Sequence, residues 1–132
     1  MSTSDFADAV IAHVPAARSL VEENWDDEDD ELLLHPFMYD LFVLAKSAYA
    51  AGDQATATWI LRIVDDGLVL GDGHVQNAVA LSFVEHYGAG PDETKAFLST
   101  WPRGLRDELA EQRSLAIGRW WNKIRSGRQN RG

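Results

Sequence analysis

The chain has 132 residues, 45% of them hydrophobic and 25% charged, and its formal net charge is −9 at pH 7. This length suits one domain with its own core, and the absence of cysteine excludes disulfides and thiolate metal sites. No apolar stretch reaches the roughly 18 residues that suggest a membrane span, and the N-terminus lacks a secretory signal pattern, so we expect a cytoplasmic protein.

The first predicted elements are two short helices. Ser4 is the expected N-cap of the first helix, which ends near His13. Pro15 suits the first turn of a second helix over residues 15–25, in which Trp25 is the last apolar position. Together they predict an N-terminal helical hairpin.

Six consecutive carboxylates follow Trp25 and lead directly into the apolar residues 32–34. Like charges repel one another and stay solvated, while the apolar neighbours should hold the run at the surface of a folded domain. We keep two main interpretations open, a solvated loop without a specific partner and a face that docks on a basic protein. The spacing does not match a calcium loop, so a specific ion site is the least favoured interpretation. The acidic run comprises Asp26, Asp27, Glu28, Asp29, Asp30 and Glu31.

Three longer helices should follow and supply most of the core. Apolar residues recur every three or four positions from Pro36 onward, until Gly52 and Asp53 end that helix. The next helix is expected over residues 54–69. A fifth should be capped by Asp72 and run through residue 86.

The C-terminal part predicts a short helix over residues 91–99 and a long helix after Pro102. The long helix mixes Trp120 and Trp121 with arginine and lysine. It could contact anionic lipid or nucleic acid, or it could close the core with a tryptophan and place its bases against the acidic body. We favour the second interpretation, because the charges it needs are present in the same chain and the bases suit the C-terminal end of a helix.

These elements predict an all-α fold, built as a compact bundle or a short stack of helical hairpins with six to seven helices. Residues 1–125 should form a single helical domain and residues 126–132 a flexible basic tail. Trp59 and Trp101 are most simply core residues. We see no segment with strand periodicity that competes with the helical pattern.

Charge is distributed unevenly along the chain. Residues 1–100 contain 18 acids and 4 bases, a balance of −14, whereas residues 101–132 contain 3 acids and 8 bases, a balance of +5. An acidic body repels nucleic acid and attracts basic proteins. We therefore expect a protein partner, with no nucleic acid and no membrane.

A second, weaker acidic cluster comprises Asp65, Asp66, Asp72 and Glu85. The first two lie at the end of a helix, where acids are locally unfavourable, and this suggests that the surface around them has a function.

Catalytic and metal-binding patterns are missing from the sequence. The four histidines form no His-Glu-x-x-His motif and no paired Glu-x-x-His motifs. Ser82 lies in an apolar helical context, not on a nucleophile elbow, and the turn from Gly71 to Gly73 lacks the third glycine of a phosphate-binding loop. We expect no enzyme activity, no metal site and no cofactor.

From about residue 15 to residue 88 the order of features is familiar: the helical hairpin, the turn Leu33-Leu34-His35-Pro36-Phe37, the links Gly52-Asp53 and Gly71-Asp72, and the segment 75–85. This order resembles small acidic helical proteins of bacteria, several of which are immunity proteins of polymorphic toxin systems. The resemblance implies that the chain binds and occludes a cognate toxin. The alternative is an acidic adaptor or DNA-mimic regulator that binds a basic host protein. We predict that the acidic run and the second cluster contact the partner, with Trp25 as the buried anchor; the oligomeric state stays open.

Overall fold

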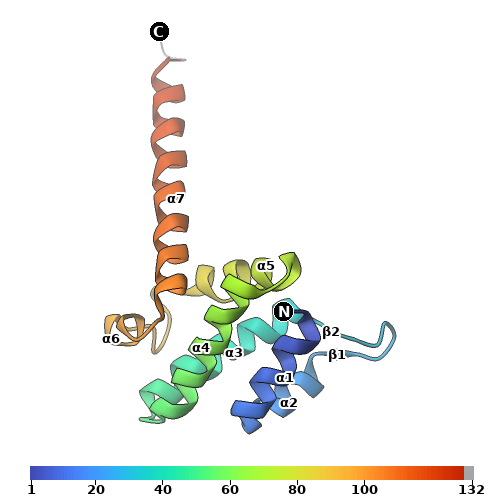
Figure 1. Ribbon diagram of the computed structural model, residues 1–132. Helices are drawn as coiled ribbons and strands as arrows, with labels where there is room; N and C mark the ends of the chain where they lie inside the picture. The colour runs from blue at the N-terminus through green and yellow to red at the C-terminus, as the bar shows by residue number, and fades with distance from the viewer. Residues whose placement is uncertain (130–132) are drawn as a thin grey trace.

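The computed structural model describes residues 1–129, and within them the chain folds into seven α-helices, two short 3-10 helices and one small β-hairpin (Figure 1). The α-helices are α1 (Thr3–His13), α2 (Arg18–Glu23), α3 (Leu34–Ala50), α4 (Gln54–Leu70), α5 (Gly73–Ser82), α6 (Lys95–Ser99) and α7 (Arg103–Gln129). The 3-10 helices are η1 (Pro15–Ala17) and η2 (Val84–His86), and the strands are β1 (Trp25–Asp26) and β2 (Glu31–Leu32). The predicted all-α fold class is confirmed.

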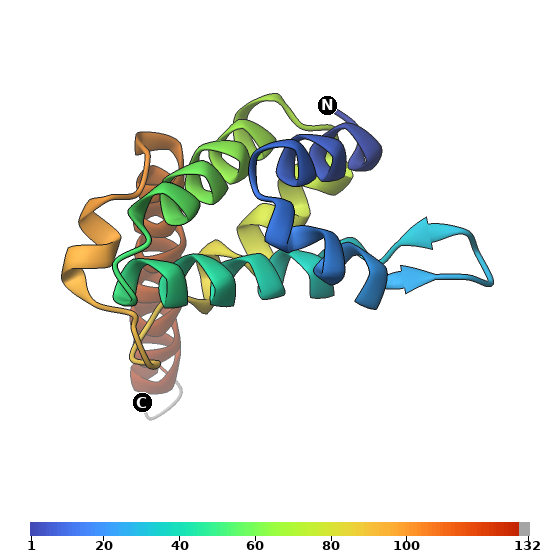
Figure 2. The same cartoon turned by 90° about the horizontal axis from the view of Figure 1, so that it is seen from below.

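The core lies between α3, α4 and α5, which pack on one another, with α1 against α4 and α2 against α3 (Figures 1 and 2). Phe37, Leu41 and Ile60 are fully buried there because apolar residues recur at helical spacing on one face of each helix. Burying a side chain of this size stabilises the fold by about 1.5–3 kcal/mol. This body supplies the rigid support from which two segments project.

Helix ends follow short-range capping. The first helix starts two residues earlier than predicted, because Ser2 and not Ser4 caps it: Asp5 N–H donates to the Ser2 hydroxyl, and Ser2 N–H donates to the Asp5 carboxylate. Asp53 caps α4 with its side chain, which accepts from Thr56 N–H, and Gly52 before it has a φ of +85°, which glycine adopts without strain. Both caps join residues only three positions apart in the sequence.

A buried ion pair fixes the irregular segment between η2 and α6. Lys46 Nζ, on α3, lies 2.8 Å from Glu93 Oε2, and the two side chains are 11% and 5% exposed. Gly88 N–H also donates to the Glu93 carboxylate, at 2.7 Å. The pair therefore holds this segment on the body, although 47 positions separate its partners in the sequence.

The β-hairpin corrects the expectation that no strand would form. Trp25 pairs with Leu32 and Asp26 pairs with Glu31 in antiparallel register. Helical periodicity did not reveal it because each strand has only two residues and aspartate is a poor strand former. The hairpin extends beyond the helices at one end of the molecule (Figure 2).

The second correction concerns α7, whose C-terminal half does not close the core. Leu105 and Leu109 are buried, but α7 then leaves the body and projects from it (Figure 1). Trp120 and Trp121 are 56% and 52% exposed, whereas Trp101, just before α7, is 1% exposed. The tryptophan that packs in the core is Trp101, whose ring centroid lies 5.7 Å from that of Phe83 and 6.0 Å from that of Phe97.

Two further expectations bear on this part of the fold. Trp59 is not a core residue: it is 37% exposed and stacks on His13, with ring centroids 4.0 Å apart. Helix α7 continues to Gln129 and so includes part of the predicted tail, while residues 130–132 lie outside the described part of the chain. None of the helices within residues 1–129 combines the length and apolar character needed to cross a membrane.

Candidate functional site: an acidic hairpin beside an exposed tryptophan

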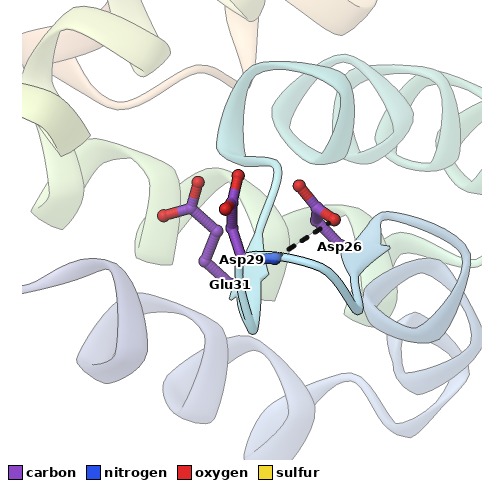
Figure 3. A group of neighbouring side chains, drawn as sticks. All are labelled: Asp26, Asp29 and Glu31. Carbon is purple, nitrogen blue, oxygen red and sulfur yellow. Dashed lines mark hydrogen bonds between the residues drawn. The ribbon is translucent and has the colours of Figure 1, made fainter.

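The acidic run forms the tip of the β-hairpin, and its own side chains shape the turn. Asp26 Oδ1 accepts hydrogen bonds from the N–H groups of Glu28 and Asp29, at 3.0 and 3.5 Å, in the manner of an Asx-turn (Figure 3). Asp30 has a φ of +51°, a left-handed conformation that aspartate tolerates better than most residues. The sequence thus folds locally into a turn that presents carboxylates to solvent.

The base of the hairpin is held firmly on the body. Leu32 is 7% exposed and belongs to the core, and Leu33 N–H donates to the carbonyl of Asn24 at 2.9 Å. The Asn24 amide donates to the carbonyl of Leu20 and to Asp40, both at 2.8 Å, which ties the hairpin to α2 and α3. Because its base is fixed on the body, the hairpin holds the acidic run in a defined position relative to the helices.

The charge of the run is not compensated inside the molecule. Among residues 1–125, whose side chains the structure describes, the ion pairs are Lys46–Glu93 and Arg103–Asp107, and neither involves the run. Residues 1–31 contain ten acids and one base. The end of the molecule that carries the hairpin therefore presents a strongly negative potential to a partner.

Three carboxylates of the run lie close together. One oxygen from each of Asp26, Asp29 and Glu31 falls within 4.8 Å of the others (Figure 3). Calcium takes six to eight oxygen ligands, whereas this group within the described residues supplies three acidic side chains, which are exposed or half-exposed. The cluster therefore supports a concentration of charge and not a built metal site.

Trp25 lies at the foot of the hairpin and is 42% exposed. It lines one shallow hollow of about 320 Å³ with Val21, Glu22 and Asp27. A second hollow, also of about 320 Å³, lies between Trp25, α1, β2 and the start of α5; its apolar lining includes Ala7, Ile11, Val21 and Leu32, and its acids are Asp8, Asp30 and Glu31. Trp25 and residues 26–31, called here the acidic docking surface, thus combine apolar area with surrounding carboxylates.

The second predicted cluster is not brought together. Asp65 and Asp66 line a hollow of about 470 Å³ near Trp59, whereas Glu85 borders a different groove, between η2 and α7. Asp72 caps α5 by accepting from Val75 N–H at 2.9 Å. Asp72 therefore has a structural role, and a contact between these four acids and a partner stays a prediction.

Asp65 has a structural explanation that the sequence did not reveal. Its carboxylate accepts from Leu105 N–H at 3.1 Å and so caps the first turn of α7 from a different helix. Burial raises the pKa of Asp65, the charge of Asp66 acts in the same direction, and the hydrogen bonds from Leu105 and Gly104 oppose them. A Cβ at Gly104 would lie 2.5 Å from the Asp65 carboxylate, so the close approach requires glycine. The available signal was that Pro102, just before α7, offers no capping side chain.

A histidine–serine contact is the arrangement most similar to a catalytic one. His35 Nδ1 lies 2.7 Å from the Ser82 hydroxyl, and the His74 ring centroid is 5.9 Å from that of His35. Ser82 is only 9% exposed and lies within α5, and within residues 1–125 no carboxylate is hydrogen-bonded to His35. The pair links α3 to α5 and lacks the exposed nucleophile and oriented base of a catalytic triad.

The fold and this surface define a small all-α protein with a projecting acidic hairpin and a solvent-exposed tryptophan at its foot. The chain belongs to the family described as domain of unknown function DUF7674, whose model matches residues 7–115. No curated protein and no solved structure matches the chain. The matched region includes the acidic docking surface and ends close to the point where α7 leaves the body.

Proposed function

We propose that this protein has a binding function without catalysis: its acidic docking surface binds a basic protein, and that partner is a bacterial toxin which the protein blocks as an immunity protein. The observation that carries the proposal is the hairpin itself, a fixed and projecting turn whose carboxylates have no ion-pair partner among residues 1–125. Holding six like charges together is locally unfavourable, and an approaching cationic surface relieves that repulsion.

The surface also offers an anchor. Interfaces draw most of their affinity from a few buried aromatic or arginine residues, while the surrounding charges set specificity and association rate. Trp25 is already half-exposed, with apolar hollows on two sides. A partner that covers Trp25 would place its basic groups beside the carboxylates of residues 26–31.

Inhibition would follow from occlusion. Enzymes that act on nucleic acids have basic clefts, and a row of carboxylates on a rigid turn can occupy the positions of phosphates there. Complementary charge would speed association toward about 10⁸–10⁹ M⁻¹s⁻¹ at low salt. No cofactor is needed for this mechanism.

Co-purification tests the proposal. The tagged protein is captured from its native cells, or together with the product of the neighbouring gene, and washed at low and at high salt. Stoichiometric capture of one basic protein whose expression alone is toxic is the expected result. Capture of a chromosomal DNA-binding protein would instead favour an acidic adaptor or DNA-mimic regulator.

Two matched charge-reversal variants locate the surface. The hairpin variant carries Asp27→Lys, Asp29→Lys and Asp30→Lys, and the control variant carries Asp92→Lys, Asp107→Lys and Glu111→Lys, which are exposed acids outside both predicted clusters. Both change the net charge equally, but only the hairpin variant should lose the partner, with an affinity loss of about 100-fold or more. Equal losses in both variants would show that net charge, and not the hairpin, governs binding.

A further inference from the structure

The projecting half of α7, residues 113–129, makes few contacts with the body among its described side chains, residues 113–125, of which Arg113 lies over the Tyr87 ring. The last hydrogen bond between α7 and the body is donated by the Gln112 amide to the carbonyl of Ala80, at 2.9 Å. From Arg113 to Arg125 every residue is exposed except Ile124, which is half-buried. The described side chains of this segment are therefore largely solvent-exposed, and those nearest the body border a groove against α5 and η2.

This segment has an apolar face that is unusual for a solvated helix. Ile117, Trp120, Trp121 and Ile124 stand at the spacing that places them on one side of a helix, and the first three are 52–58% exposed. The rings of Trp120 and Trp121 lie 4.8 Å apart, edge to face. Isolated helices of this length are marginal in water, and Gly118 weakens this one further. The apolar face of this segment therefore calls for a binding surface that buries it, called here its cover.

The charge of the segment identifies the chemistry of the cover. From residue 112 onward the chain contains six bases and no acid. The cover must therefore be anionic. Nucleic acid and anionic membranes would be repelled by the body, where residues 1–100 carry a balance of −14. Two projecting halves would repel each other along their bases. An acidic protein surface with an apolar hollow satisfies both requirements.

The chain itself carries such a surface. The hollow between Trp25, α1 and β2 has an apolar lining and an acidic border that includes Asp30 and Glu31. Its chemistry complements tryptophans flanked by Arg119 and Lys123. Within one molecule the hairpin and the projecting half of α7 lie at opposite ends (Figures 1 and 2), so the contact has to form between two copies.

We propose that the projecting half of α7 docks on the acidic docking surface of a second copy of this chain, with Trp120 and Trp121 against the hollow beside Trp25. Two copies close the contact when each supplies its helix to the other, which gives a reciprocal dimer with two-fold symmetry. Self-association covers the same surface that the proposed function uses, so a basic partner has to displace α7 to bind. The contact itself can form whether or not the partner is a toxin.

Analytical ultracentrifugation of the purified protein tests the contact without any partner. The wild-type protein should gain mass as concentration rises, and it should lose that mass at 1 M salt, where the Debye length falls to about 3 Å. The hairpin variant and a helix variant, Trp120→Ser with Trp121→Ser, should each be monomeric and keep wild-type circular dichroism. A control with Val69→Ser and Leu70→Ser, also strongly exposed, should associate as the wild type does.

Mixing the two defective variants gives the decisive result. The hairpin variant retains an intact α7 and the helix variant retains an intact hairpin, so their mixture should form a one-to-one complex. A wild-type protein that stays monomeric at every concentration would overturn the proposal. Association of the hairpin variant alone would show that α7 pairs with α7 instead. Tryptophan-dependent sedimentation of a monomeric wild type with phosphatidylglycerol vesicles would identify a membrane as the cover.

Discussion

The acidic hairpin and the projecting half of α7 both extend from the same helical body, but they are held in different ways. The hairpin turns on its own Asx hydrogen bonds and is fixed at its base by Leu32 and Asn24. The half-helix of α7 has only intrahelical hydrogen bonds and one apolar face in water. The hairpin is therefore held in one conformation by its own contacts, whereas the half-helix receives little support from the body. Opposite charge makes the two regions complementary.

The largest expected effect is the difference in stability loss between substituting a tryptophan of the body and substituting one of the half-helix. Trp101→Ala should lower the free energy of unfolding by about 3–5 kcal/mol, because it empties a fully enclosed aromatic site. Trp120→Ala should change it by less than about 0.5 kcal/mol, because the side chain is exposed. Urea denaturation of dilute protein measures both. Similar losses for the two substitutions would show that α7 packs on its own body.

The buried ion pair provides the second test of the body. Glu93→Gln should destabilise the fold by about 3–5 kcal/mol, since it leaves Lys46 charged and without its partner in a site that is about one-tenth exposed. Asp107→Asn removes the exposed pair with Arg103 and serves as the control, with an effect of about 0–1 kcal/mol. Thermal melts of both variants give the comparison.

The next prediction tests whether Trp25 anchors the partner at the foot of the hairpin. Trp25→Ala should lower affinity for the captured partner by about 2 kcal/mol or more, as for an interface hot spot. Titration calorimetry measures the loss, and Leu33→Ala, an exposed neighbour, is the matched control. Unchanged affinity in Trp25→Ala would remove the anchor from the interface.

The start of α7 is sensitive to the Asp65 cap. Asp65→Ala should destabilise the protein by about 1–2 kcal/mol, because it leaves the N–H of Leu105 without its acceptor. Asp65→Asn keeps an acceptor oxygen and should cost less. Because burial raises the pKa of Asp65 in the folded state, protonation favours folding. The wild type should therefore gain stability relative to Asp65→Asn as pH falls through the folded pKa, which denaturation at pH 7 and pH 4 measures.

The smallest effect concerns the helicity of the projecting half. Gly118→Ala should raise helix content at 222 nm, since alanine favours a helix by about 1 kcal/mol over glycine and nothing lies within 4 Å of the added methyl group. The unfolding midpoint of the body should not move. A shift of that midpoint would indicate that the projecting half and the body unfold as one unit.

The sequence predicted the helical body well, because its signals are local. Apolar periodicity, the break at Gly52-Asp53 and the cap at Asp72 placed α4 and the start of α5 correctly. It missed the capping of α7 by Asp65 and the pair between Lys46 and Glu93, since these partners are 40 and 47 positions apart and no local rule connects them.

The projecting segments show a different limit of sequence reasoning. An apolar face at helical spacing has the same pattern whether it packs inside its own chain or waits for another, so Trp120 and Trp121 were assigned to the core. The charge of the acidic run was evident, but its turn geometry depends on Asx hydrogen bonds within six acids, which periodicity does not detect. Trp25 was expected to end a helix as an apolar position, but it begins β1 and is 42% exposed, and its role as an anchor stays a prediction.

The most direct test of the account is the association rate constant of the captured partner, measured by stopped flow at 0.05 M and 0.5 M salt. For the wild type and the control charge reversal, the rate should fall steeply as salt rises, because the hairpin steers a cationic surface. For the hairpin variant the rate should already be low at 0.05 M salt and should change little at 0.5 M. The same steep salt dependence in the hairpin variant would contradict the claim that this turn is where the partner docks.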